Sequence, residues 1–280
     1  MDENSPIGVF DSGVGGLSVL RWIRDRLPAE DLVYVADSNN APYGSKSPEF
    51  VRQRAMFLSD FLVGRKVKAI VVACNTATVT CITDLRERFS VPFIGVEPGV
   101  KPGLAATRSG VVGVMATSET LKSQAYSRLL QRLGTHGNVV SQECPGLVEK
   151  IEAMALSDTE TMAMVEHYVA PLLVRGADTI VLGCTHYPFL EPMIRAVAGQ
   201  GVEIIDTGRA VAAQVATRLA EKGMLSGRAV PGSEMFWTTG SEKVGQVVSH
   251  LWGKPVEISR LADVMPAGPE PDRPSPEVAS

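Results

Sequence analysis

The chain has few cysteines, no surplus of positive charge and no long hydrophobic run, and each shortage excludes a class of protein. Its 280 residues hold only four cysteines, which are widely spaced and form no CxxC pair. This pattern argues against a disulfide framework and is typical of reduced thiols in an intracellular protein. No apolar run approaches the roughly 18 residues that a membrane-spanning helix needs. We therefore expect a soluble, cytoplasmic protein without a membrane partner.

Positive charge and metal-ligand spacing are missing as well. The 27 lysines and arginines are outnumbered by 31 acidic residues, which gives a net charge of -4. This balance gives no support for nucleic-acid binding, and no nucleic-acid partner is expected. The four histidines are scattered without ligand spacing, so no metal site is expected either. The first six residues carry two acidic side chains and no basic one and run directly into a predicted strand, which does not resemble a signal peptide.

What the chain does contain is one strand-and-loop unit that occurs twice. Residues 69–78 and 179–188 are each a short apolar run, rich in β-branched residues, that ends in a small residue, a cysteine and a polar residue. Such a run is typical of a buried parallel strand. The order of predicted strands and helices repeats around it, with a shift of 105 residues from Gly8 to Gly113 and of 110 residues from Cys74 to Cys184. This near-constant shift indicates an internal duplication.

The duplication predicts an α/β protein with two similar lobes. We expect the first lobe to comprise residues 1–97 and 208–260, because a last predicted strand and helix follow the second repeat and would return to the first. The second lobe would comprise residues 98–207. Residues 261–280 are rich in proline and acidic residues and have no periodicity, which predicts a disordered tail.

Two of the cysteines, Cys74 and Cys184, come directly after these predicted strands. In an open α/β sheet, the segments past the carboxyl ends of the strands line the ligand crevice. A lone cysteine is often just a small buried hydrophobe, but matching positions in two repeats, each followed by polar residues, favour a function. The N-terminus of a helix would stabilise a thiolate, and two thiols across a cleft could remove a proton from one face of a carbon and return one to the other. Cys81 and Cys144 lack such a context and are predicted to be structural.

Asp11, Ser12 and His186 stand beside these cysteine loops in the predicted fold. Taken alone, an Asp-Ser-Gly sequence is more often a turn, and a lone histidine is more often structural. Next to a reactive thiol, each could orient the sulfur or tune its proton. The glycine-rich residues 13–16 lack both the GxGxxG spacing and a P-loop lysine, so a nucleotide fingerprint is not predicted. A tight turn and an anion-binding nest both remain open for them.

With these residues in view, the sequence resembles the glutamate racemases, a cofactor-independent family. The resemblance is carried by five blocks, which are unspecific one by one and highly specific together: residues 8–20, 42–44, 73–77, 94–99 and 182–188. It implies two α/β lobes with mostly parallel sheets, related by a pseudo-two-fold axis, with the active site in the cleft between them. It also implies interconversion of L- and D-glutamate for peptidoglycan synthesis, without pyridoxal phosphate or metal, in a homodimer.

The resemblance assigns roles to individual residues. Cys74 and Cys184 would be the catalytic acid/base pair, with Cys74 taking the Cα proton of the D-enantiomer and Cys184 that of the L-enantiomer. Asp11 and His186 match the family's assisting groups beside the two thiols. The positions that match substrate contacts are Asp11, Ser12, Pro42, Tyr43, Gly44, Asn75, Thr76, Thr185 and His186.

The sequence departs from the family pattern after Cys144. Family members usually carry a second proline after the Cys-Pro pair, and here Cys144 and Pro145 are followed by glycine. The family's assisting glutamate then best matches Glu152, but Glu149 competes with it. Only six residues precede the first predicted strand, so regulation through a longer N-terminal extension, which the resemblance associates with some members, is not expected.

Two alternatives stay open on the sequence. The first is a racemase of another acidic amino acid such as aspartate, because spacing alone does not fix the depth of a pocket. Residues 42–44 and 185–186 favour glutamate. The second is a two-lobed protein that binds a small anion without catalysis. Two thiols argue against it, because pure binding needs N–H donors rather than cysteines.

Overall fold

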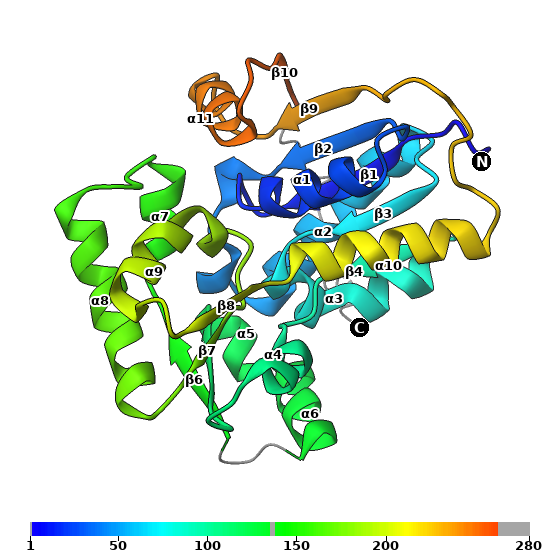
Figure 1. Ribbon diagram of the computed structural model, residues 1–280. Helices are drawn as coiled ribbons and strands as arrows, with labels where there is room; N and C mark the ends of the chain where they lie inside the picture. Colours follow the sequence, from blue (N-terminus) through cyan, green and yellow to red (C-terminus); the bar gives the residue numbers. More distant parts are fainter. Residues whose placement is uncertain (1, 135–137, 263–280) are drawn as a thin grey trace, which may run out of the picture.

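Two sheets of parallel strands organise the structure, a computed structural model that describes residues 2–134 and 138–262. The first sheet has the strand order β10–β9–β2–β1–β3–β4 and the second the order β6–β5–β7–β8. Figure 1 shows the first sheet in the upper lobe and the second in the lower lobe. The strands are β1 (Ile7–Asp11), β2 (Leu32–Ala36), β3 (Ala69–Val72), β4 (Phe93–Gly95), β5 (Val112–Ala116), β6 (Val139–Glu143), β7 (Thr179–Leu182), β8 (Glu203–Asp206), β9 (Glu234–Thr238) and β10 (Ile258–Arg260).

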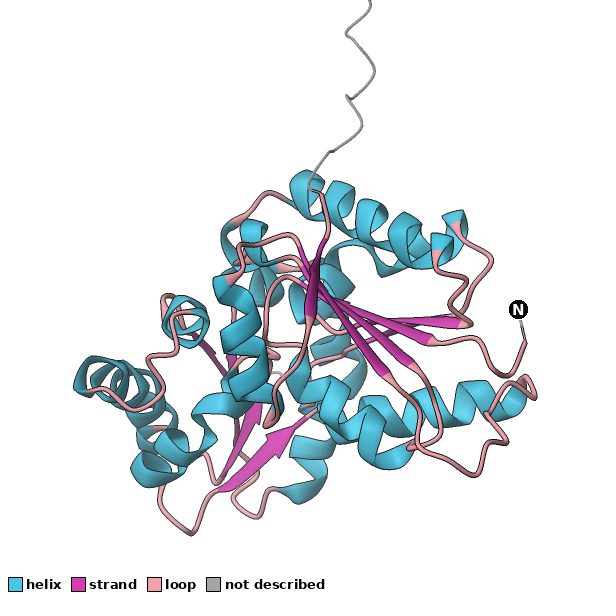
Figure 2. Ribbon diagram, turned by 90° about the horizontal axis from the view of Figure 1, so that it is seen from above, coloured by secondary structure: helices cyan, strands magenta, loops and turns pink. Residues whose placement is uncertain are grey.

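Helices alternate with the strands and cover the sheets. Figure 2 shows the first sheet, in magenta, between helices on both of its faces. None of the helices within residues 2–134 and 138–262 is both long and apolar enough to cross a membrane. The helices are α1 (Leu17–Arg26), α2 (Pro48–Gly64), α3 (Asn75–Arg88), α4 (Val100–Ala106), α5 (Ser118–Lys122), α6 (Gln124–Leu133), α7 (Leu147–Glu152), α8 (Thr159–Val174), α9 (Glu191–Ala198), α10 (Gly208–Glu221) and α11 (Lys243–Trp252), with the 3₁₀ helices η1 (Ser38–Asn40), η2 (Tyr43–Ser45) and η3 (Tyr187–Leu190).

The first sheet separates two apolar cores. Helices α1, α10 and α11 bury their apolar side chains on one face, and α2 and α3 bury theirs on the other. Successive side chains of β3 point to opposite faces, with Ala69 and Val71 in one core and Ile70 and Val72 in the other. Strands that are buried on both faces read as continuous apolar runs, which is the pattern that predicted them. Cys81 packs in the core with α2 and α3, as predicted.

The second sheet is covered in the same way. Helices α7, α8 and α9 pack on one face, and α4 and α6 pack on the other. Cys144 is buried in the core that α7, α8 and α9 form, which agrees with its predicted structural role. Burial raises the pKa of both structural thiols, that of Cys81 to about 12 and that of Cys144 well above its usual range. Neither thiol is therefore an available nucleophile at neutral pH.

The two lobes share strand order and register, as the duplication predicts. The order β2–β1–β3–β4 in the first sheet matches β6–β5–β7–β8 in the second, and all of these pairings are parallel. Ile7 of β1 pairs with Ala69 of β3, just as Val112 of β5 pairs with Thr179 of β7. The prediction of a two-lobed α/β protein with parallel sheets is thereby confirmed.

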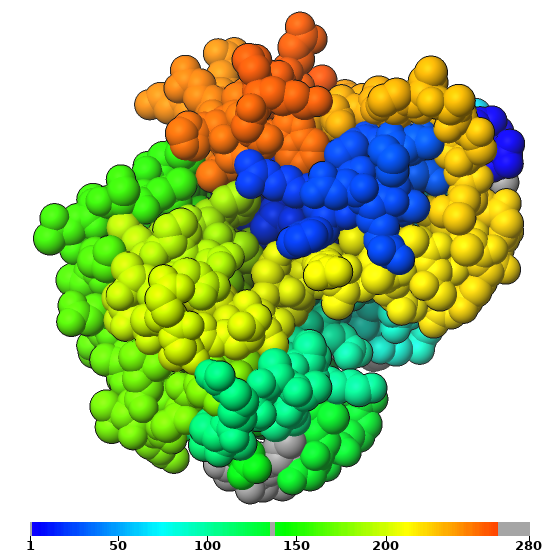
Figure 3. Space-filling model, in the orientation of Figure 1, coloured from blue at the N-terminus to red at the C-terminus, as the bar shows by residue number. Residues whose placement is uncertain are grey.

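After β8 the chain returns to the first lobe. Helix α10 packs along α1, β9 pairs with β2, and β10 pairs with β9. Figure 3 shows this returning segment, in yellow and orange, on both sides of the blue N-terminal residues. Strand β10 was not predicted from the sequence. We propose residues 1–97 with 208–260 as one domain and residues 98–207 as the other; the predicted tail, from residue 263 onward, lies outside the described residues.

A buried ion pair links the amino ends of β2 and β3. Lys68 directly precedes β3, and its ammonium group contacts the Glu30 carboxylate, with both side chains at most 2% exposed. The ammonium also donates to the Glu3 carbonyl over 2.6 Å, and Glu30 accepts a hydrogen bond from the backbone N–H of Ser226 over 2.8 Å. The pair thus joins the N-terminal segment, the first βαβ unit and the segment that precedes β9.

Removing one partner of this pair should destabilise the fold strongly. The Lys68→Ala variant leaves the Glu30 carboxylate buried without its counter-ion, which costs about 3–5 kcal/mol in the free energy of unfolding. Urea unfolding followed by circular dichroism measures the loss. The exposed pair of Arg88 and Asp60 is a matched control, because Arg88→Ala should leave stability nearly unchanged. Equal effects in the two variants would contradict the role given to Lys68.

Candidate active site

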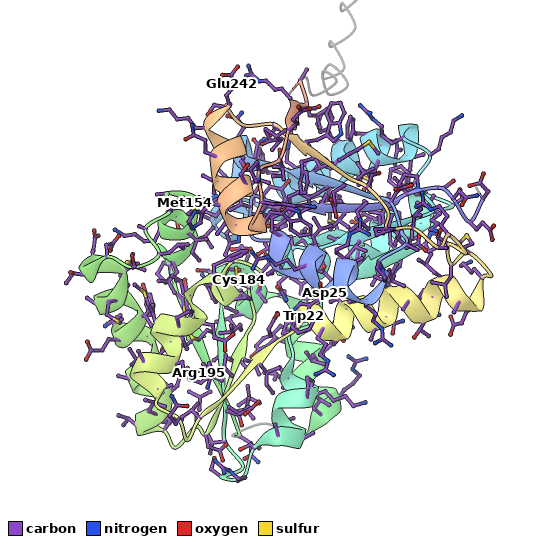
Figure 4. All side chains as sticks on the ribbon, turned by 45° about the horizontal axis from the view of Figure 1, so that its top comes forward. Trp22, Asp25, Met154, Cys184, Arg195 and Glu242 are labelled. Atoms are coloured by element: carbon purple, nitrogen blue, oxygen red, sulfur yellow. The ribbon has the colours of Figure 1, made fainter. Side chains whose placement is uncertain are left out.

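A small cavity lies where the two lobes meet, and both cysteines of the repeat line it. Figure 4 shows Cys184 in the middle of the molecule, between the lobes. Cys74 follows β3 and Cys184 follows β7, each beside the point where the strand order of its sheet reverses. Ligands of open α/β sheets bind at such points. The cavity is lined by Ser12, Pro42, Tyr43, Gly44, Cys74, Asn75, Thr76, Thr117, Val148, Cys184, Thr185 and His186.

Cys74 caps the N-terminus of α3. Its Sγ accepts a hydrogen bond from the backbone N–H of Ala77 over 3.5 Å and lies 3.8 Å from the Ser12 hydroxyl. The helix N-terminus predicts a stabilised thiolate, but burial and the negative charge of Asp11 outweigh it and raise the pKa of Cys74 well above its usual range. In this closed cavity Cys74 is therefore a neutral thiol, a group that can give a proton.

The surroundings of Cys184 differ from those of Cys74 and correct one prediction. Cys184 is followed by the 3₁₀ helix η3 rather than by an α-helix, so no α-helix N-terminus faces its sulfur. Pro188 has no N–H to donate to the Cys184 carbonyl four residues back, and the N–H of Tyr187 donates to it instead over 3.1 Å. The polar neighbour of this sulfur is His186, whose Nδ1 lies 3.9 Å from Sγ.

His186 is held by Glu152, which comes from α7. The Glu152 Oε1 lies 2.7 Å from the His186 Nε2 and also accepts the N–H of Val14, from the first lobe, over 2.7 Å. Burial alone would lower the pKa of His186, but hydrogen bonds to Cys184 and Glu152 and their charges raise it well above its usual value. The imidazole is therefore cationic near pH 7. The competing Glu149 is exposed.

Asp11 and Thr185 join the lobes beside the cavity. Asp11 is fully buried at the end of β1, where its carboxylate accepts the backbone N–H of Gly16 over 2.8 Å. The Thr185 hydroxyl donates to the other oxygen of Asp11 over 3.4 Å, and the Thr185 carbonyl accepts the Ser18 hydroxyl over 2.8 Å. Burial raises the pKa of Asp11 above its usual range. Asp11 thus positions the second-lobe loop and adds negative charge next to the thiols.

Asn75 presents an unpaired amide to the cavity. Its side chain is 3% exposed, and neither amide atom has a hydrogen-bond partner among the described residues. Buried polar atoms are almost always hydrogen-bonded, so an amide of this kind at a cavity points to a ligand. The neighbouring Thr76 hydroxyl lies 3.0 Å from that of Thr117, across the two lobes.

Sequence reasoning missed two lining residues, Thr117 and Val148. The internal repeat contains the signal for Thr117, because it follows β5 as Ser12 follows β1. Val148 carries no such signal, since an apolar residue on α7 reads as ordinary core. The predicted Pro42, Tyr43 and Gly44 do line the cavity, and a Cβ built on Gly44 would lie 2.7 Å from that of Thr117. The first-lobe loop therefore packs against the second lobe without room for a side chain.

The cavity is closed in this structure. Its volume of about 10 Å³ has room for one water molecule at most, and an amino acid is many times larger. The lobes must therefore separate to admit a substrate of that size and close again around it. Within the described ranges, no group of three or more histidine, cysteine and acidic side chains is placed to hold a metal ion.

Comparison with known proteins adds an independent line of evidence. A family model described as Asp/Glu/Hydantoin racemase matches residues 8–215. The chain is 53% identical over 248 residues to the glutamate racemase of Methylococcus capsulatus, covering 88% of this chain and 92% of that one. It is 48% identical over 262 residues to the glutamate racemase of Pseudomonas aeruginosa PAO1, covering 92% and 98%.

Solved structures match over almost the whole chain. Glutamate racemase isoform RacE1 from Bacillus anthracis superposes with a TM-score of 0.85 at 35% identity and covers 92% of this chain and 98% of its own. Escherichia coli glutamate racemase, solved with L-glutamate and the activator UDP-MurNAc-Ala, gives a TM-score of 0.80 at 30% identity, with coverage of 92% and 98%.

The charge on His186 can be tested through Glu152. The Glu152→Gln variant should lower the pKa of His186, because a neutral amide replaces the carboxylate that binds Nε2. An NMR titration of the imidazole measures both values. Since the folded-state pKa is raised, the stability that it contributes is fully present below about pH 6.5 and is lost as the pH rises through the folded-state value. An imidazole that titrates at or below about pH 6.5 in the unaltered protein would contradict this account.

Proposed function

The chain belongs to the Asp/Glu/Hydantoin racemase family and is an amino-acid racemase, and we propose that it interconverts L- and D-glutamate. One observation carries the mechanism: Cys74 and Cys184, from equivalent loops of two duplicated lobes, line the same closed cavity. A racemase needs a base on one face of Cα and an acid on the other, and a duplicated thiol supplies both.

The proton steps balance without a further reactant. One sulfur, as thiolate, takes the Cα proton, and the opposite thiol gives its proton to the other face of the same carbon. The product is the opposite enantiomer, and the two sulfurs have exchanged protonation states. Proton exchange through solvent then restores the first state.

The surroundings of the two sulfurs support distinct starting roles. The cationic His186 lies beside Cys184, whereas Cys74 is held as a neutral thiol. This difference suits removal of the Cα proton of L-glutamate by Cys184 and reprotonation by Cys74. The reverse reaction, which starts from D-glutamate, uses the same groups in the opposite sense. Glu152 and Asp11 act as assisting groups, through His186 and through the loop of Thr185.

Hydrogen-bond donors around the cavity suit the carboxylates of the substrate. Asn75 with its unpaired amide, the hydroxyl-bearing Ser12, Thr76 and Thr185, and Tyr43 and Gly44 with their backbone N–H groups all line the cavity. Asp11 is buried beside the cavity and is not among its lining residues, and its carboxylate would provide a counter-charge for the ammonium group. Donors fixed in a closed, water-poor site stabilise developing negative charge far better than water does. We propose that they lower the barrier enough for a weakly acidic Cα–H to react without a cofactor.

The two-thiol mechanism predicts the isotope pattern of the product. After incubation with L-glutamate in D₂O, the D-glutamate formed should carry deuterium at Cα, because the returned proton comes from an exchanged thiol. Cys74→Ser and Cys184→Ser should each reduce racemisation by about 100-fold or more, since each removes one general acid or base. Optical rotation and mass spectrometry follow the reaction.

Two controls make this experiment decisive. Cys81 lies in the same lobe as Cys74, but its thiol packs in the apolar core and not at the cavity. The Cys81→Ser variant should therefore racemise glutamate as the unaltered protein does. L-Aspartate in parallel tests the substrate, and turnover of aspartate alone would replace glutamate in the proposal. Full activity in either active-site variant would overturn the mechanism.

We also propose a homodimer in the cytoplasm, where the D-glutamate would supply peptidoglycan synthesis. The resemblance to the family supports this assembly. Sedimentation equilibrium should give twice the mass of the chain at micromolar concentration. The mass of a single chain, unchanged when L-glutamate is added, would contradict it.

A further inference from the structure

Asp37, at the carboxyl end of β2, gathers an unusual number of hydrogen bonds. Its carboxylate is fully buried beneath the segment that contributes Pro42, Tyr43 and Gly44 to the cavity. The Oδ2 accepts the Tyr43 hydroxyl over 2.5 Å and the Arg54 Nε over 2.9 Å. The Oδ1 accepts the Arg54 Nη2 over 2.7 Å, the Thr239 hydroxyl over 2.8 Å and the Asn40 amide over 3.1 Å.

Stability alone is a poor explanation for this cluster. Arg54, on α2, is 1% exposed and binds Asp37 through two nitrogens, which makes the pair a buried, bidentate salt bridge. The desolvation of two charges offsets most of the attraction between them, so a buried pair is weak evidence for a gain in stability. What such a pair fixes well is geometry, because each partner holds the other in one place.

The geometry that Asp37 fixes is that of Tyr43. The ring of Tyr43 is 1% exposed and lines the cavity together with Cys74. Burial and the charge of Asp37 raise the pKa of Tyr43 well above its usual value, so the phenol stays protonated and donates. The next residue, Gly44, approaches Thr117 of the second lobe so closely that a Cβ would lie 2.7 Å from that of Thr117. A shift of Tyr43 therefore moves the cavity wall and the contact between the lobes together.

Thr239 links the same carboxylate to the last strands of the chain. Its hydroxyl donates to Asp37 and accepts the backbone N–H of Asn39 over 3.2 Å, and its own N–H donates to the Ala36 carbonyl over 3.1 Å. Residue 239 follows directly after β9, which has returned to the first sheet from the second lobe. The returning chain thus contributes the Thr239 hydroxyl to the hydrogen bonds around Asp37.

We propose that Asp37 is a positioning residue of the racemase site, which holds the wall formed by Tyr43 and Gly44 in place through the Tyr43 hydroxyl. Arg54 and Thr239 hold the carboxylate itself. The proposal rests on the proposed racemase function. Asp37 acts through Tyr43 and does not touch the substrate, so its loss weakens binding in the ground state and the transition state alike and raises KM more than it lowers kcat.

The test uses three variants of the full chain, with glutamate racemisation and thermal unfolding measured for each. Tyr43→Phe removes only the hydroxyl, and Asp37→Asn removes the charge that binds it. Each should reduce kcat/KM by about 10- to 100-fold, mostly through KM, because displacing a binding wall by about 1 Å has effects of that size. The double variant should lose no more than the worse single variant, since both changes break one interaction.

A matched control comes from a second buried ion pair of this lobe. Glu30 and Lys68 are as buried as Asp37 and Arg54 but lie at the amino ends of the strands, away from the cavity. Glu30→Gln should lower the melting temperature without a change in KM. If Asp37→Asn fails to fold, the proposal is tested with Tyr43→Phe and with Thr239→Val, which removes only one hydrogen bond to Asp37.

The outcomes separate the two proposals. If the unaltered protein does not racemise glutamate, the proposed function itself is wrong. Racemisation by the unaltered protein together with an unchanged KM in Tyr43→Phe would overturn the role of Asp37 alone. An increase in KM in Glu30→Gln equal to that in Asp37→Asn would also overturn it, because any buried charge would then have the same effect. Additive losses in the double variant would show that Asp37 does not act through Tyr43.

Discussion

The carboxylate of Glu152 joins the two lobes beside the site of the chemistry. It binds the imidazole of His186 in its own lobe and the backbone N–H of Val14 in the other. Two glycines make this approach possible, because a Cβ on Gly13 would lie 1.9 Å from the Glu152 Oε1 and one on Gly15 would lie 2.2 Å from the His186 Nδ1. The glycine-rich loop is therefore needed for close packing between the lobes. The charge of His186 and the close approach of the two lobes at this point both depend on this contact.

Duplication explains the symmetry of the site, and the differences between the repeats explain its chemistry. The same strand order brings Cys74 and Cys184 to equivalent places at one cavity. Their neighbours then diverge. Cys74 faces a hydroxyl and a helix N-terminus, whereas Cys184 faces a cationic imidazole. A reaction that moves one proton off a carbon and another onto it needs two groups that are alike in kind and opposite in state. A duplicated thiol with unequal neighbours meets that need.

Much of this could be predicted from the sequence, because the decisive signals are local. The apolar runs predict the strands. The two cysteines that directly follow such runs predict the pair of thiols that lines the cavity. What could not be predicted depends on contacts across the fold. The choice between Glu149 and Glu152 depends on which face of α7 meets His186. The absence of an α-helix after Cys184 depends on one missing N–H at Pro188. Asp37 reads as an ordinary loop residue until the chain returns and brings Thr239 to it.

The central claim is that the two sulfurs flank one carbon. A crystal structure of the protein with D-glutamate bound tests it most directly. The account predicts that Cα lies between the Sγ atoms of Cys74 and Cys184, on opposite faces and within about 3.5 Å of each, as a reactive geometry requires. A substrate bound with both sulfurs on one face of Cα, or with either sulfur beyond reach of it in the closed state, would contradict the account.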